Sequence, residues 1–363
     1  MNPESKPDWW DPWSCQPYKL PKEEKPRLGA ANLYEYLKVA STFLLLSPAV
    51  VAAYLRPPAR TDKQRTALDF VGLSVTPQSE HLSEIEDMIA ELGVRRLLLR
   101  VPAWEAGELD RYQEFMARFP GHDFVINILQ SRDSVARPEE WQQQLDSILR
   151  SLGNRASAFQ IGNAINRSKW GCRHTGDWLQ LMDRACRAAE SIGNIQLAGS
   201  SVIDFEPLLT LRTLVNLHPQ KFDVCAALLY INRRGSAFGR QYGFFDLERK
   251  IRLVHAMSRL SNKCPGRLWI TETNWPLLDT KPYTPNSGHP RSTVDEATQA
   301  RYLTQYYQVA WHSQRVERVY WWQLINPGYG LVDHRQGGLR KMPSYHAFKR
   351  LLEGEIEEQP KPD

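Results

Sequence analysis

Short apolar runs alternate regularly with amphipathic stretches from residue 66 to residue 354, and this alternation constrains the fold more than any other feature. The runs have the length and the β-branched composition of buried strands, while the stretches between them repeat apolar residues at helical spacing. Eight strand-helix units fill about 290 residues. Eight units at this length predict an α/β fold of the closed (β/α)8 type, a TIM barrel, instead of an open doubly wound sheet.

The expected elements have definite bounds. The strands are expected at 67–73, 96–101, 124–129, 158–162, 195–202, 224–231, 268–273 and 319–324. The helices are expected at 82–93, 109–119, 138–152, from 178 onward, and at 208–217, 247–260, 303–311 and 345–352. No glycine-rich phosphate-binding motif follows any of these strands, so the nucleotide-binding folds of the α/β class are disfavoured.

Residues 1–38 contain six prolines and no apolar periodicity, which predicts a disordered tail. Within it, Trp9, Trp10 and Trp13 stand among acidic residues. The three tryptophans indicate either a docking motif for a protein partner or aromatic side chains at a membrane surface. An accidental cluster in a loose tail is the remaining alternative. Residues 356–363 are likewise expected to form a disordered C-terminal tail.

The 17 residues from Val39 to Leu55 carry no charged side chain. This length is close to the minimum for crossing a bilayer, so the sequence predicts a transmembrane anchor at 39–55, followed by a linker at 56–65. A buried core helix is the alternative. A cleaved signal peptide is disfavoured because the charged region before the run is too long. The expected location is the inner membrane, as a single-pass protein with the tail inside and the barrel at 66–355 in the periplasm or outside the cell.

The charge and the cysteines exclude several classes of protein. The 46 basic and 41 acidic residues leave a formal net charge of +5, an excess too mild and too dispersed to predict a nucleic-acid partner. The five cysteines form no CxxC pair, so neither a disulfide scaffold nor a zinc site is expected. His174, His289 and His334 fall in expected loops without the spacing of metal ligands. We expect no cofactor and no metal.

Polar and aromatic residues end several of the predicted strands. In a TIM barrel the chemistry lies at the carboxyl ends of the strands, and Glu272 follows the buried run at 268–271. The residues expected to join Glu272 from other strand ends are Arg100, Asn163, Tyr230, Trp321 and Trp322. Arg and Tyr side chains can hold a carboxylate ionised, Asn can bind a ring hydroxyl, and Trp offers a flat apolar face to a sugar.

Two motifs make the chain resemble the clan A retaining glycoside hydrolases, a (β/α)8 superfamily, across residues 66–355. The first is Phe-Gln-Ile-Gly-Asn-Ala-Ile-Asn at 159–166, and the second is Trp-Ile-Thr-Glu-Thr-Asn-Trp at 269–275. The resemblance implies that Glu272 is the nucleophile and that Asn163 is the asparagine of the clan's strand-four Asn-Glu pair. It also implies that Arg100 and Tyr230 are the strand-two arginine and the strand-six tyrosine.

The sequence departs from the clan at two positions. Ala164 stands where the clan has its acid/base glutamate, and Leu228 stands where many members have a histidine. Retaining hydrolysis needs a second carboxyl group to protonate the leaving oxygen and then to activate water. The candidate replacements for this acid/base are loop carboxylates, Asp204 and Glu206 first, then Glu105 and Asp333. The alternative is that these four are ordinary loop or helix-start charges.

Basic residues are frequent in the loops that follow the predicted strands: Arg132, Arg167, Lys169, Arg173, Arg233, Arg234, Arg240, Arg291 and Arg335. They favour an anionic glycan as the partner, against the alternative of solvated loop charge. Two functions stay open. One is a membrane-anchored retaining glycoside hydrolase or transglycosylase that acts on a bacterial cell-surface polysaccharide with a non-standard acid/base. The other is an inactive pseudo-glycosidase that binds glycan or serves in polysaccharide or lipopolysaccharide assembly.

Overall fold

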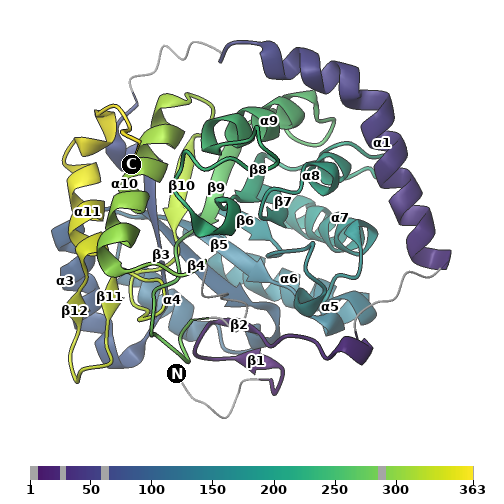
Figure 1. Ribbon diagram of the computed structural model, residues 1–363. Helices are drawn as coiled ribbons and strands as arrows, with labels where there is room; N and C mark the ends of the chain where they lie inside the picture. Colours follow the sequence, from purple (N-terminus) through teal and green to yellow (C-terminus); the bar gives the residue numbers. More distant parts are fainter. Residues whose placement is uncertain (1–6, 25–29, 59–64, 285–291, 363) are drawn as a thin grey trace.

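Eight parallel strands form a closed barrel in the computed structural model, which describes residues 7–24, 30–58, 65–284 and 292–362. Helices between the strands surround the barrel (Figure 1). The predicted TIM barrel is therefore confirmed. Each strand pairs with the next in chain order, and β10 closes the ring by pairing with β3.

The element bounds agree with the expected alternation in most places. The barrel strands are β3 (Val71–Val75), β4 (Arg96–Pro102), β5 (Asp123–Leu129), β6 (Ala156–Ile161), β7 (Leu197–Ile203), β8 (Val224–Leu228), β9 (Leu268–Thr273) and β10 (Arg318–Trp321). The helices after the first strand are α3 (Leu82–Leu92), α4 (Asp110–Ala117), α5 (Arg132–Ala136), α6 (Pro138–Leu152), α7 (Thr175–Ile192), α8 (Pro207–Leu214), α9 (Leu247–Leu260), α10 (Glu296–His312) and α11 (Pro343–Leu352). A two-stranded pair, β11 (Val332–Asp333) and β12 (Arg340–Lys341), precedes α11.

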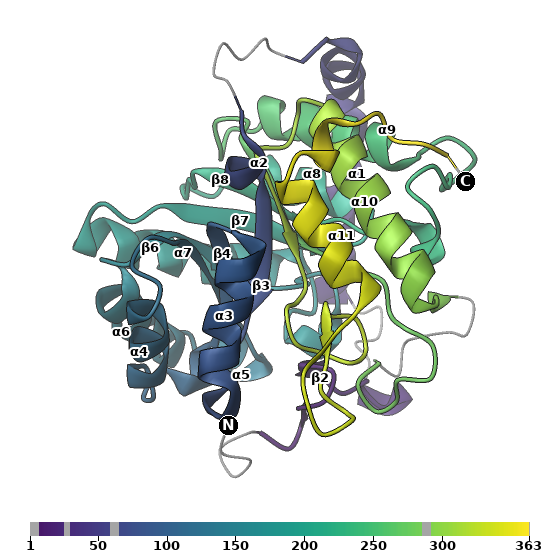
Figure 2. The same cartoon turned by 90° about the vertical axis from the view of Figure 1, so that its left-hand side faces the viewer.

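The core has two layers because side chains alternate across each strand. Inward-facing residues fill the barrel, with Leu98, Val125, Trp269 and Tyr320 in one buried cluster. Outward-facing residues pack under the helices in a larger cluster. Figure 2 shows α3 and α11 covering one side of the barrel.

Local sequence signals explain where individual helices begin and end. Helix α6 has Pro138 in its first turn, where a missing backbone N–H costs nothing, and it buries Trp141 and Leu145 on one face. Helix α3 ends at Gly93, whose φ of 68° suits a residue without a Cβ. Both helices agree with the sequence prediction.

The first predicted strand begins later than expected. Residues 67–70 form a short helix, α2 (Ala67–Phe70), and the strand β3 begins at Val71. The reason is local: the Thr66 hydroxyl accepts a hydrogen bond from the backbone N–H of Asp69 at 3.3 Å and caps the helical turn.

The prediction of a disordered tail at 1–38 is wrong for the part that the structure describes. Residues 7–24 form a hairpin of β1 (Trp10–Asp11) and β2 (Gln16–Pro17), followed by a short helical turn, η2 (Lys22–Glu24). The hairpin is ordered because it packs on the mouth of the barrel: Trp10 is buried and lies 5.3 Å from Trp104 and 5.9 Å from Trp170 between ring centroids. Residues 1–6 and 25–29 lie outside the described part.

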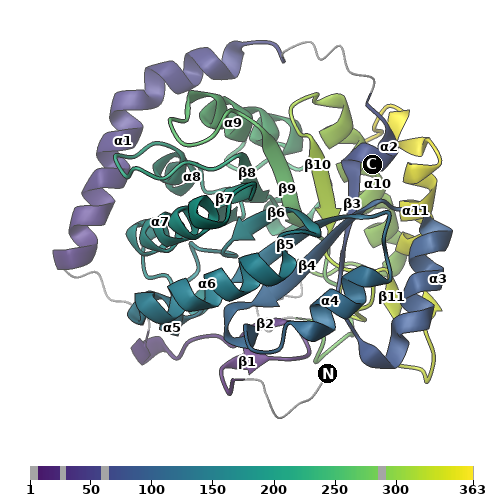
Figure 3. The same cartoon turned by 180° about the vertical axis from the view of Figure 1, so that it is seen from behind.

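Helix α1 (Ala30–Leu55) begins nine residues before the predicted anchor at 39–55. Its segment Asn32–Leu55 is long and apolar enough to cross a membrane by length and composition. The helix packs on the outside of α8 and α9 and stays mostly exposed (Figure 3), so the alternative of a buried core helix does not describe it. Of the predicted linker at 56–65, residues 59–64 lie outside the described part.

The prediction of a disordered C-terminal tail at 356–363 is also wrong over the described residues. A 3-10 turn, η8 (Glu355–Glu357), buries Ile356 completely in the main core. The backbone oxygen of Glu355 accepts a hydrogen bond from Gln308 Nε2 of α10 at 2.9 Å. The composition of the segment does not indicate this docking, because the core that receives Ile356 is formed by other elements, α10 and α11.

Candidate active site

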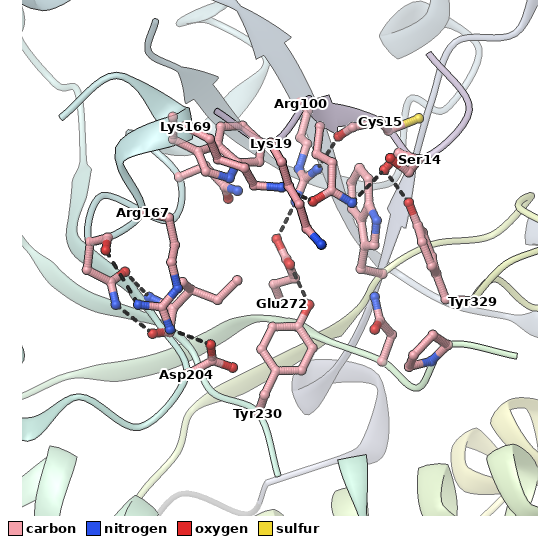
Figure 4. A pocket seen from close by; sticks show the side chains of 18 of the residues that line it. Ser14, Cys15, Lys19, Arg100, Arg167, Lys169, Asp204, Tyr230, Glu272 and Tyr329 are labelled. Carbon is pink, nitrogen blue, oxygen red and sulfur yellow. Dashed lines mark hydrogen bonds and ion pairs between the residues drawn. The ribbon is translucent and has the colours of Figure 1, made fainter. Parts of the chain in front are cut away.

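Five of the six predicted strand-end residues line one cavity of about 460 Å³ at the carboxyl end of the barrel (Figure 4). The ends of β4, β6, β8, β9 and β10 bring in, in this order, Arg100, Asn163, Tyr230, Glu272 and Trp322. These residues are far apart in the sequence, but parallel barrel strands all end at the same rim. The structure thus brings the five side chains together.

Both carboxylate oxygens of Glu272 accept hydrogen bonds. Arg100 donates from Nη2 to Oε2, and the Tyr230 hydroxyl donates to Oε1. Figure 4 shows these two donors approaching Glu272 from opposite sides. Burial, together with the negative charge of Glu272, raises the pKa of Tyr230 well above its usual value, so its hydroxyl stays a donor. Two donors on opposite oxygens hold the orientation of this buried carboxylate.

The Arg100 guanidinium is itself held on two further sides. Its Cζ lies 3.3 Å from the centroid of the Trp322 ring, within the range of a cation–π contact. Its Nη1 donates to the backbone oxygen of Cys15 in the hairpin at 3.3 Å. Arg100 therefore links the carboxylate of Glu272 to the N-terminal segment.

Asn163 is fixed by neighbours on β5 and on the loop that follows it. Its Oδ1 accepts from Asn127 Nδ2 at 2.9 Å, and its backbone N–H and C=O are both bonded to the side chain of Gln130. The buried Nδ2 of Asn163 has no hydrogen-bond partner among the described residues. Asn163 lines the cavity, but this nitrogen is itself buried.

The structure separates the two tryptophans that were expected to bind substrate. Trp322 lines the cavity. Trp321 does not: it is fully buried under the helices and stacks on Trp275, with 6.0 Å between ring centroids. The expectation for Trp321 is wrong because neighbouring residues of a strand point to opposite sides, so Tyr320 faces the barrel interior and Trp321 faces the helix layer.

The two departures from the glycosidase pattern lie in one apolar cluster. Ala164, Leu228 and Tyr230 are buried together with Trp170 and with Trp10 of the hairpin. No sequence pattern connects Ala164 with the Trp-rich segment at 9–13. In the fold, the region that the resemblance assigns to an acid/base glutamate and a histidine is occupied by an apolar cluster that includes the chain's own Trp10.

Of the four candidate replacements for the acid/base, one lines the cavity. Asp204 does so, and its Oδ2 is 2.6 Å from Arg167 Nη2. Glu206 lies 3.4 Å from the same guanidinium but outside the cavity lining, at the residue before α8.

The other two candidates are structural. Glu105 is buried and accepts hydrogen bonds from Arg111 and Tyr112. Asp333 is buried, and although burial opposes its ionisation, the hydrogen bonds from Arg335 and Arg340 lower its pKa to about 2. Neither residue lines the cavity.

Cationic side chains outnumber carboxylates around the cavity. The cations that line it are Lys19, Arg100, Arg167, Lys169 and Arg234, against the two carboxylates Asp204 and Glu272. Burial lowers the pKa of Lys169 to about 8, against the attraction of the nearby carboxylates Asp11 and Glu272.

Only three of the nine basic loop residues singled out in the sequence line the cavity: Arg167, Lys169 and Arg234. Arg132 and Arg335 form ion pairs elsewhere, and Arg291 lies outside the described residues. The sequence thus indicated the sign of the charge but not which loops turn inward.

The hairpin supplies one wall of the cavity, through Ser14, Cys15, Gln16, Lys19 and Leu20. These residues were missed because they precede the barrel by some fifty positions and match no strand-end pattern. The signal that pointed to them was the tryptophan cluster at 9–13, which was predicted to be a docking motif for a partner or a set of aromatics at a membrane surface. In the structure it docks on the barrel of the same chain.

The described residues include no group of three or more His, Cys, Asp or Glu side chains placed to hold a metal ion. His174 caps α7, accepting from the backbone N–H of Asp177 at 3.3 Å. His334 packs against the Tyr283 ring, and His289 lies outside the described residues.

The closed barrel and the comparison with solved structures show that the chain has a clan A glycoside hydrolase-like fold. No protein-family model matches the sequence, and no curated protein matches it. The resemblance stated from the two motifs is confirmed at the level of the fold.

Individual solved structures show the likeness. A family 39 glycoside hydrolase from the gut symbiont Bacteroides cellulosilyticus WH2 superposes with a TM-score of 0.60 and 16% identity, over 84% of this chain. This chain spans 66% of the length of that protein. The GH53 catalytic domain of Ignisphaera aggregans gives 0.58 and 16%, over 82% of this chain and 99% of that one. A family 1 β-glucosidase from Thermotoga maritima gives 0.54 and 12%, over 76% and 87%.

Proposed function

We propose that this protein binds an acidic glycan in the cavity around Glu272 and lacks the acid/base step of ordinary glycoside hydrolysis. The observation that carries this proposal is the apolar cluster of Ala164, Leu228 and Trp10. General acid/base help contributes about 10²- to 10⁴-fold to such reactions. An alanine packed against tryptophan provides none of it, and Asp204 is already paired with Arg167.

The charge of the cavity supports an anionic ligand. Five cations face two carboxylates, and the Arg100 guanidinium is already engaged with Glu272. The cationic side chains of this lining, Lys169 and Arg234 among them, suit uronate or phosphate groups, because cationic donors in a partly enclosed site attract anions more strongly than they do in open water.

The proposed ligand is a polysaccharide of the bacterial surface, with the barrel on the periplasmic or outer side of the membrane. The glycosidase names of the structural neighbours support a carbohydrate, and the apolar helix α1 supports a membrane location. In this role the protein serves polysaccharide or lipopolysaccharide assembly by holding the glycan.

A matched pair of ligands tests the proposal. Full-length protein in detergent is titrated with oligogalacturonate and with the same oligomer fully methyl-esterified, which removes the charge and keeps the sugar skeleton. We expect binding of the acid form, weakened by added salt, and at least about tenfold weaker binding of the ester. Equal affinity for the two forms, or binding that added salt leaves unchanged, would contradict the electrostatic part of the proposal.

A second function, retaining glycosyl transfer, is favoured by one specific observation: both oxygens of Glu272 are held by hydrogen-bond donors. In that reaction Glu272 attacks the anomeric carbon, the bond to the leaving oxygen breaks, and a glycosyl ester forms. If the leaving group is a phenol of low pKa, it departs as the aryl oxide without being protonated. The first step can then proceed without the missing acid.

Intact mass measurement separates the two functions. Full-length protein is incubated with dinitrophenyl glycosides of several sugars; the full chain is needed because residues 14–20 line the site. Without a general base, water hydrolyses the glycosyl ester slowly, so the ester should accumulate. A sugar-sized gain in mass that disappears in Glu272→Gln identifies Glu272 as the nucleophile. Absence of any adduct, together with glycan binding, supports the binding protein.

A further inference from the structure

Helix α1 has two distinct faces along its whole length. The inner face packs on α8 and α9 and includes Glu35, Val39 and Val50, with both valines buried. The outer face exposes large apolar side chains from one end to the other: Leu33, Tyr34, Tyr36, Leu37, Phe43, Leu44, Leu45, Val51 and Leu55.

Polar contacts near both ends fix the helix on the barrel. Near its N-terminal end, Glu35 Oε2 lies 3.5 Å from Nη2 of the buried Arg212 in α8. Near its C-terminal end, the Arg252 guanidinium of α9 lies 5.0 Å from the centroid of the Tyr54 ring. The Arg56 backbone oxygen, just beyond the helix, accepts from Arg315 at 3.4 Å. Figures 1 and 3 both show α1 following the outside of α8 and α9.

The chain on each side of α1 is attached to the same barrel. Before it, the hairpin docks on the barrel mouth, where Trp10 is buried and the Tyr329 hydroxyl donates to the backbone oxygen of Ser14. After it, Thr66 caps α2, and the chain then enters the barrel as β3. The 24 residues Asn32–Leu55 make a helix about 36 Å long. If it crossed a bilayer core of about 30 Å, the hairpin and the barrel would be on opposite sides and could not touch.

We propose that α1 lies in the plane of a membrane surface, with its outer face in the lipid and its inner face on the barrel. We infer contact with a lipid bilayer because large apolar side chains are exposed on the outer face over the whole length of the helix. The 17 residues 39–55 also carry no charged side chain that could pair with a protein partner. Transfer of these exposed apolar side chains from water to the boundary between headgroups and acyl chains is favourable. The hairpin, the barrel and the glycan cavity then all lie on one side of the membrane.

Vesicle flotation tests the lipid contact. Full-length protein is exchanged from detergent into a suspension of phosphatidylethanolamine vesicles containing a minority of phosphatidylglycerol. We expect the protein to float with them. The paired variant Leu44→Glu/Leu45→Glu should bind at least about tenfold more weakly, since it puts two charges on the lipid side. The matched control Leu278→Glu changes an exposed leucine in the loop after β9 and should float like the parent.

Two outcomes of this assay would overturn the proposal. The first is failure of the parent protein to float. The second is flotation of the paired variant equal to that of the parent. If that variant also changes its oligomeric state, the outer face is a contact between copies of the chain.

Labelling tests the topology independently of these variants. In a Cys15→Ser background the four remaining native cysteines are buried, so Tyr18→Cys and Tyr242→Cys add one exposed thiol on each side of α1. A membrane-impermeant maleimide is added to sealed proteoliposomes. Chains that carry both labels would show that the hairpin and the barrel lie on the same side of the membrane, as the proposal expects. Chains that carry a single label until detergent is added would show that α1 crosses the bilayer, and the proposal would be wrong.

Discussion

Ala164 combines an unusual backbone with a fully buried methyl group. Its φ is 46°, in the left-handed region, and its side chain lies in the cluster with Trp10 and Leu228. A larger polar side chain at this position must either displace the hairpin or lose its hydration.

We therefore expect Ala164→Glu to lower the free energy of unfolding by about 2–4 kcal/mol at pH 7 and to leave glycoside hydrolysis undetectable. Burial raises the pKa of the introduced carboxyl, so part of the loss should be recovered as the pH falls and this group is protonated. Chemical denaturation over a range of pH measures this effect, with Ala164→Gln as the uncharged control of equal size. A large gain in hydrolysis without loss of stability would show instead that the position is open to the sugar.

Lys169 supplies a pH-dependent charge to the cavity. Because burial lowers its pKa to about 8, it is cationic at pH 7 and becomes neutral as the pH rises through that value. Affinity for oligogalacturonate should therefore fall by up to about tenfold between pH 7 and pH 9, as measured by titration calorimetry.

The variant Lys169→Arg provides the control for this prediction. A guanidinium stays charged over the whole range, so its affinity should be independent of pH between 7 and 9. If the parent protein shows the same flat profile, Lys169 does not contact the anion.

Among the elements, the hairpin at residues 7–24 has Trp10 as its most buried tryptophan. Trp10 is 9% exposed and packs against Trp104 and Trp170, whereas Trp13 is 48% exposed. Burial of a tryptophan contributes far more than a surface contact. The docked state should therefore respond to Trp10 much more than to Trp13.

Trp10→Ala should reduce the free energy of hairpin opening by about 3 kcal/mol, and Trp13→Ala by less than about 1 kcal/mol. Hydrogen exchange of the Tyr18 amide reports this opening, because that amide donates to the Trp9 backbone oxygen across the hairpin at 2.9 Å. Trp10→Ala should also weaken glycan binding, since the segment forms a wall of the cavity. Equal exchange in the two variants would mean that the hairpin is held by its polar contacts.

At the scale of the whole molecule, segments near both ends of the described chain pack on the barrel and its helices. The hairpin covers the mouth, and η8 near the C-terminus buries Ile356 in the main core. Truncation after Glu353 should lower the free energy of unfolding by about 2–4 kcal/mol, through the loss of one fully buried isoleucine and its neighbouring hydrogen bonds.

The control for this truncation is a chain that ends at Glu358. It keeps Ile356 and the hydrogen bond from Gln308 to Glu355, so it should unfold within about 1 kcal/mol of the parent in denaturant. An equal loss in both truncated chains would locate the stabilisation in residues 359–362 instead.

The sequence alone determined the barrel, the carboxyl-end location of Glu272 and its neighbours, and the sign of the charge around them. These properties depend on local periodicity and on the topological rule that parallel strands end at one rim, both of which can be read along the chain. The prediction for Trp321 is wrong. Which residues of β10 face the barrel interior depends on the register of that strand with β3 and β9.

Only the tertiary structure decided what happens to the two tails and to Ala164. A short segment rich in proline, or one that carries a single isoleucine, has no stable structure by itself, since its own contacts cannot offset the entropy of ordering it. Trp10 becomes ordered because Trp104 and Trp170, both more than ninety positions away, receive it. Ile356 becomes ordered because η8 packs against α10 and the adjacent helix α11 in the main core. Long-range burial of this kind leaves no periodic pattern in the sequence.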